Sequence, residues 1–125
     1  MPYSDIVLEH FRAPRNMRVM EKPDAVGVAG EPGHGNFMVI YLRLQGGRIA
    51  EATYQTHGCC PSIAAGSWLT NRLRGVGVGD ARDWSAPRIE AGLGGLPPHK
   101  AHCAFLAETA LRRALEGLDR TESTV

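Results

Sequence analysis

The sequence has few cysteines, almost no net charge and no long apolar run, and each shortage excludes a class of protein. Three cysteines, two of them adjacent, cannot form the even disulfide framework of a small secreted domain. No apolar run reaches the roughly 20 residues that a membrane-spanning helix needs. A formal net charge of +1 leaves no broad basic surface for nucleic acid. We therefore expect neither a nucleic-acid partner nor a membrane partner.

The start of the chain, residues 1–5, lacks the basic and apolar regions of a secretory signal. We therefore expect a cytoplasmic protein with reduced thiols. The 125 residues contain 43% apolar and 22% charged residues, which is typical of an ordinary globular protein. This length predicts a single domain over residues 1–125.

Hydrophobic periodicity predicts an α+β fold in which a three-stranded antiparallel sheet packs with helices. Gly46-Gly47 is typical of a hairpin turn, and Ser4 and Ser62 precede helical patterns as caps. A proline pair, Pro97-Pro98, marks the start of the last helix. The predicted strands cover about 25–30, 37–44 and 48–56, and the main helices about 4–12, 62–74 and 98–118.

Cysteine and histidine are concentrated in three segments. All three cysteines and four of the five histidines lie at 34, 57–60 and 99–103. Thiolate and imidazole are preferred ligands of zinc and iron. We therefore predict that Cys59, His102 and Cys103 meet at an exposed metal or cluster site. The predicted helix start after Cys59-Cys60 favours the thiolate form of at least one of these two residues.

Each of these residues also has a simpler interpretation. Cys59 and Cys60 could cap a helix and pack, and His99 could be a solvated surface residue.

Offsets of three and four residues would place His99 on one helical face with His102 and Cys103. His34 lies between glycines in a flexible turn, where the backbone can bring its imidazole close to a neighbouring site.

At these residues the chain resembles the IscU/NifU-type iron–sulfur cluster assembly scaffolds. The likeness covers nearly the whole length, and its most specific part ends at Cys103. The matching residues are Tyr3-Ser4, Pro14-Arg15-Asn16, Gly58-Cys59 and Leu96-Pro97-Pro98-x-Lys100-x-His102-Cys103. The resemblance implies an α/β fold with an antiparallel three-stranded sheet, in agreement with the periodicity.

The resemblance also implies a function and partners. It implies transient assembly of a [2Fe-2S] cluster on three cysteines, two of which match Cys59 and Cys103, with His102 beside the third. A cysteine desulfurase would deliver sulfur, with Cys103 matching a persulfide acceptor, and acceptor apoproteins would receive the cluster. Several members of the family hold zinc instead. The segment that resembles the recognition peptide for an Hsp70-type chaperone is Leu96, Pro97, Pro98, His99 and Lys100.

One part of the sequence departs from the family pattern. Where the family has Cys-Gly-Asp, this chain has His34-Gly35-Asn36, so the first cluster cysteine is a histidine and the acidic residue an amide. Cys60 replaces a usual glycine, and His57 replaces a usual tyrosine. One thiol is lost from one loop and another is gained in a different loop.

Three hypotheses remain open from the sequence. In the first, Cys59, Cys103 and either Cys60 or His34 hold a [2Fe-2S] cluster, with His102 in reserve. In the second, His34, Cys59, His102 and Cys103 hold a single zinc or iron ion. In the third, the fold is an interaction or regulatory module that docks a desulfurase or a chaperone without building clusters.

Enzymatic catalysis is not expected. A cysteine near a histidine could form a nucleophile–base pair. The sequence shows no oxyanion-hole motif, phosphate-binding loop or substrate-pocket signature beside it. The Cys/His set therefore favours metal binding over catalysis.

Overall fold

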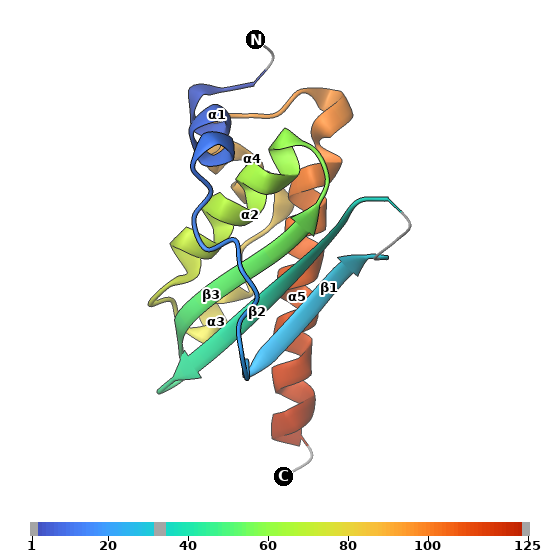
Figure 1. Ribbon diagram of the computed structural model, residues 1–125. Coiled ribbons are helices and arrows are strands. Elements are labelled where there is room, and N and C mark those ends of the chain that lie inside the picture. The colour runs from blue at the N-terminus through green and yellow to red at the C-terminus, as the bar shows by residue number, and fades with distance from the viewer. Residues whose placement is uncertain (1–2, 32–34, 124–125) are drawn as a thin grey trace.

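The computed structural model describes residues 3–31 and 35–123, with residues 119–123 described by their backbone alone. It is an α+β fold, as the sequence predicts, in which helices pack on an antiparallel sheet (Figure 1). The elements are α1 (Asp5–Arg12), β1 (Ala25–Gly30), β2 (Phe37–Gln45), β3 (Arg48–His57), α2 (Cys60–Leu73), α3 (Val78–Ala81), α4 (Ala86–Gly92), the short 3₁₀ turn η1 (Pro98–Lys100) and α5 (His102–Ser123).

The sheet is a meander in the order β1-β2-β3, and all three predicted strands are confirmed to within a residue. Gly46 and Gly47 form the predicted hairpin turn, with positive φ angles of 61° and 76° that suit glycine. Alternate residues of β2 are buried, because successive side chains point to opposite faces of a strand. One face of the sheet therefore presents the apolar layer.

Helices α2 and α5 cover this apolar face and form the core with it (Figure 1). Small residues allow the close packing. A Cβ at Gly27 of β1 would lie 1.9 Å from the Ala110 oxygen of α5, so this strand and helix pack backbone against backbone. A Cβ at Gly66 of α2 would lie 2.3 Å from the ring of Tyr54 in β3. These contacts fix the position of both helices on the sheet.

The start of α2 differs from the prediction. The helix begins at Cys60, its N-cap is Cys59, and Ser62 lies inside the first turn instead of capping the helix. The N–H groups of Ser62 and Ile63 both donate to the Cys59 carbonyl oxygen, at 3.0 and 3.2 Å. The helix therefore starts two residues earlier than predicted, directly at the vicinal cysteines.

The last helix also differs from the prediction at both ends. The N–H groups of Lys100 and Ala101 bond three residues back, so Pro98 begins a separate 3₁₀ turn, and α5 starts only at His102. The helix then continues to Ser123 instead of ending near Leu118. Residues 119–123 contain no glycine or proline, so nothing in the sequence there breaks a helix.

A buried histidine joins α1 to α2. His10 is 8% exposed, and its Nδ1 lies 2.7 Å from Ser67 Oγ and 3.3 Å from the Arg15 guanidinium. A guanidinium can only donate, so Nδ1 accepts and the ring is neutral. Burial lowers the pKa of His10 from its ordinary 6.5, and the Arg15 charge lowers it further; Glu9 partly opposes this, and Arg72 adds a small further decrease.

This histidine predicts that stability falls in mild acid. A histidine with a lowered pKa in the folded state is protonated more readily when unfolded. Its contribution is therefore complete above pH 6.5 and is lost as the pH falls from there through the folded pKa. Urea unfolding between about pH 7.5 and 5 should show a falling midpoint, with a smaller fall in His10→Gln. The matched control is the exposed His57→Gln, which should retain the wild-type slope.

Candidate functional site

Two of the predicted site residues lie at the starts of α2 and α5, and the first turns of these helices lie at the same end of the molecule (Figure 1). Cys59 ends the β3–α2 turn, and Cys103 lies in the first turn of α5. Their Sγ atoms are 3.6 Å apart, although the residues are separated by 44 positions in the sequence. His102 lies beside them, with its Nε2 3.6 Å from the Cys103 Sγ. The structure thus brings Cys59, His102 and Cys103 together as predicted.

These distances suit a metal ion with tetrahedral ligands. Two thiolates bound to one zinc at about 2.3 Å have sulfurs roughly 3.8 Å apart, and a thiolate and an imidazole have donor atoms roughly 3.6 Å apart. The same donor geometry suits the iron of an iron–sulfur cluster. The Cys59 and Cys103 sulfurs are 3.6 Å apart, and the Cys103 sulfur is 3.6 Å from the His102 Nε2 atom, so both distances are close to these values. Among residues 3–31 and 35–123, no group of three or more Cys, His, Asp or Glu side chains is placed so that it could hold a metal ion.

The site is less exposed than predicted. Cys103 is 0% exposed, whereas Cys59 is half-buried and His102 is exposed. The α5 backbone carries Cys103 on the core-facing side of the helix, one turn before the buried Ala107. Cys103 is therefore the most buried of the three residues.

A residue that the sequence reasoning missed joins the two cysteines. Ser62 is 0% exposed, its Oγ donates to Cys103 Sγ at 3.3 Å, and it lies 3.8 Å from Cys59 Sγ. A Cβ at Gly58 would lie 2.8 Å from this hydroxyl oxygen, so glycine leaves room for Ser62. The offset of three residues from Cys59, at the start of a helix, was the available sequence signal for this contact.

The two thiols differ in their ease of ionisation. Burial raises the pKa of Cys103 to about 11, and the nearby Cys59 adds to this rise. Burial also opposes ionisation of Cys59, but hydrogen bonding with the side chain and backbone of Ser62 and with Cys103, together with the Lys100 charge, lowers its pKa overall. Cys59 is therefore the thiol that forms a thiolate first, as expected for a thiol at the start of a helix.

Comparison with known proteins identifies the family. The model of the NifU-like N terminal domain matches residues 2–124. The chain belongs to the NifU-like N-terminal domain family. The iron-sulfur cluster assembly scaffold protein IscU 1 of Archaeoglobus fulgidus is 41% identical over 113 residues, covering 90% of this chain and 74% of that protein. The IscU scaffold protein of Haemophilus influenzae is 34% identical, covering 92% of this chain and 94% of that protein.

A solved structure shares the fold of this NifU-like domain. The N-terminal part of a nitrogen-fixing NifU-like protein from Brucella abortus matches with a TM-score of 0.72 and 17% sequence identity. The match covers 99% of this chain and 96% of that one. This confirms the α+β fold that the sequence pattern predicts.

One further loop of the NifU-like domain comes close to the site. A Cβ at Gly58 would lie 3.4 Å from Asn36 Cγ, so the end of the loop between β1 and β2 lies beside Gly58, the residue that precedes Cys59. His34, the predicted ligand in this loop, lies outside the described residues. Cys60 is half-buried and packs against the core cluster, and burial, followed by the nearby Cys59, raises its pKa.

The predicted chaperone segment lies next to the thiols. It runs directly into α5, with Pro98 and His99 exposed and Leu96 packed against the core. His99 lies in the 3₁₀ turn before α5, so the prediction that one helix places His99, His102 and Cys103 on a common face is wrong. The Lys100 charge lowers the pKa of both Cys59 and Cys103, a role that the sequence reasoning did not assign.

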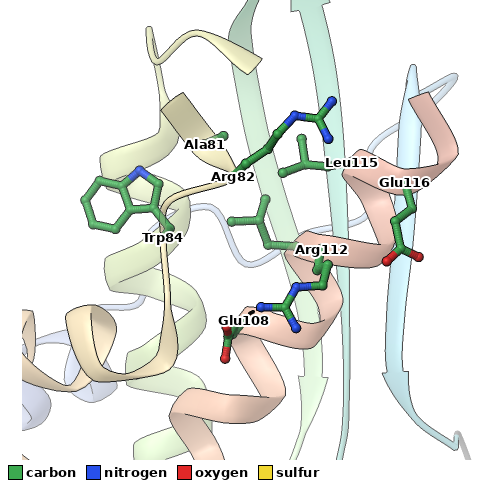
Figure 2. A pocket seen from close by; sticks show the side chains of 8 residues that line it. Ala81, Arg82, Trp84, Glu108, Arg112, Leu115 and Glu116 are labelled. Carbon is green, nitrogen blue, oxygen red and sulfur yellow. Dashed lines mark hydrogen bonds and ion pairs between the residues drawn. The ribbon is translucent and has the colours of Figure 1, made fainter. Parts of the chain in front are cut away.

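A separate pocket of about 230 Å³ lies beside the middle of α5 (Figure 2). Leu111, Leu115 and Ala81 form its apolar part, Trp84 one wall, and charged side chains its rim. Arg112 at this rim is paired with Glu108 of the same helix. None of the lining residues is a cysteine or a histidine, so this pocket is separate from the thiol site.

Proposed function

We propose that this chain is an iron–sulfur cluster assembly scaffold, which holds a [2Fe-2S] cluster transiently as cargo. The observation that carries the proposal is the 3.6 Å approach of the Cys59 and Cys103 sulfurs in a domain of this family. Relatives at 34–41% identity bear the name of such scaffolds. In this role the chain binds a cluster and passes it to another protein, and it does not catalyse a reaction.

The donor geometry supports two of the proposed ligands, Cys59 and Cys103. Cys59 and Cys103 supply two thiolates, and either His34 or Cys60 completes the protein set, with His102 beside it. Histidine in place of one thiolate removes a negative charge from the site and raises the potential of an iron–sulfur cluster. The same donors also suit a zinc ion, and the 3.6 Å spacing of the Cys103 sulfur and the His102 nitrogen favours this as the second candidate.

The partners follow from the chemistry of this cargo. Sulfur would come from a cysteine desulfurase, and the cluster would go to acceptor apoproteins. The exposed Pro98 and His99 of the segment from Leu96 to Lys100 suit recognition by an Hsp70-type chaperone. The free thiols Cys59, Cys60 and Cys103 suit a reducing compartment such as the cytoplasm. No helix in the described part of the chain is both long and apolar enough to cross a membrane.

Anaerobic reconstitution tests this proposal. Wild-type protein incubated with iron and sulfide under reducing conditions should develop visible charge-transfer absorbance, with two irons and two sulfides per chain, because thiolates bind iron in such clusters. Metal analysis of the same preparation is the matched measurement. Recovery of tightly bound zinc with no colour would favour the zinc site. Failure to bind either would leave the third hypothesis, an interaction module that docks partners without cargo.

A further inference from the structure

We propose that Ser62 is a positioning residue for the cargo, a role that rests on the proposed function and deepens it. The hydroxyl would hold the Cys103 sulfur towards Cys59 before loading and would keep a hydrogen bond to that sulfur afterwards. The inference starts from the one hydroxyl in the described part of the chain that contacts both thiols, at 3.3 and 3.8 Å.

The contact is built into the fold. Ser62 is 0% exposed, so its hydroxyl needs a partner inside the protein, and Cys103 Sγ is the acceptor that the structure provides. Gly58 preserves the space around the hydroxyl, since a Cβ there would lie 2.8 Å from the oxygen. The rigid first turn of α2 supplies the backbone for both Cys59 and Ser62. Ser62 is therefore held in place by contacts inside the protein and does not reach solvent.

The chemistry of sulfur ligands gives this contact a consequence. A hydrogen bond to a bound thiolate draws electron density from the sulfur, and such bonds help to set the potential of an iron–sulfur cluster. A residue that orients a metal ligand without touching the metal also affects how tightly the metal is bound. Ser62 would therefore affect both how tightly an ion is held and how easily a cluster is reduced.

The experiment compares Ser62→Ala with Ser67→Ala. Ser67 lies on the same helix, is also 0% exposed and also bonds through its hydroxyl, but to His10 and Arg15. Zinc affinity is measured by chelator competition at one fixed pH, and the midpoint potential by titration of the reconstituted cluster. Ser62→Ala should bind zinc at least about 10-fold more weakly and give a more negative potential. Ser67→Ala should stay within about twofold of wild type, with its effect confined to thermal stability.

The outcomes separate this proposal from the function on which it rests. Ser62→Ala with unchanged zinc affinity and potential, or Ser67→Ala with an equal loss, overturns the role of Ser62 and leaves the scaffold function standing. A wild-type protein that binds neither zinc nor a cluster overturns both. If the wild-type protein binds zinc but no cluster, the cluster scaffold function is wrong. The role of Ser62 is then still tested by the zinc affinity of Ser62→Ala.

Discussion

Replacing Cys103 or Cys59 with serine should abolish the charge-transfer absorbance of the reconstituted protein. The sulfurs of these two cysteines are 3.6 Å apart, close enough for both to bind one metal ion. A serine hydroxyl is not ionised near neutral pH and is a poor ligand for zinc or cluster iron. We also expect zinc affinity to fall at least about 100-fold. Loss of a residue that only supports a metal ligand already lowers affinity by about 10- to 100-fold, and loss of the ligand itself should cost more.

Cys60→Ser is the comparison for this pair, because Cys60 is one of the two candidates for the third ligand. It makes the same substitution one residue away, at a thiol that packs against the core instead of meeting Cys103. If His34 completes the ligand set, Cys60→Ser should retain most of the absorbance and His34→Ala should lose it. The reverse result would identify Cys60 as the third ligand. Full absorbance in Cys59→Ser or Cys103→Ser would contradict the site itself.

Gly27→Ala should be among the most destabilising single-methyl additions in this chain. The new Cβ would lie 1.9 Å from the Ala110 oxygen, 2.4 Å from the Ala114 nitrogen and 3.0 Å from its Cα. These atoms belong to the α5 backbone, so no side chain can rotate to relieve the overlap. Overpacking of this kind typically costs about 1–3 kcal/mol, and we expect about 3 kcal/mol or an unfolded protein. Urea unfolding of the two proteins measures the difference.

Gly117→Ala is the control, because it adds the same methyl group to α5 itself. A Cβ at Gly117 meets nothing within 4 Å, and this residue is exposed. Alanine in a helix is favoured over glycine by about 0.5–1 kcal/mol, so this variant should be slightly more stable than wild type. Equal behaviour of the two variants would show that the close packing of β1 on α5 does not control stability.

Local signals were sufficient for the sheet and for the presence of the main helices. The run of mostly apolar residues over 37–44, followed by Gly46-Gly47 and by the alternating residues of 48–56, predicts a hairpin because each signal depends on neighbours in the sequence. Helix ends were less accessible. Ser62 has the side chain of a cap, yet α2 starts at Cys60, because the chain leaves β3 in a turn that places Cys59 as its N-cap.

The sequence by itself determined which residues could bind a metal: a thiol at 59, another at 103 and an imidazole at 102. Only the tertiary structure decided that they meet, since the two thiols are 44 positions apart in the sequence and no local rule sets the distance between them. It also decided that Cys103 is buried, because α5 must turn one face to the sheet, and that Ser62 bridges the sulfurs. Packing of α2 and α5 on one sheet is the physical reason, because it brings the first turns of both helices to the same end of the molecule.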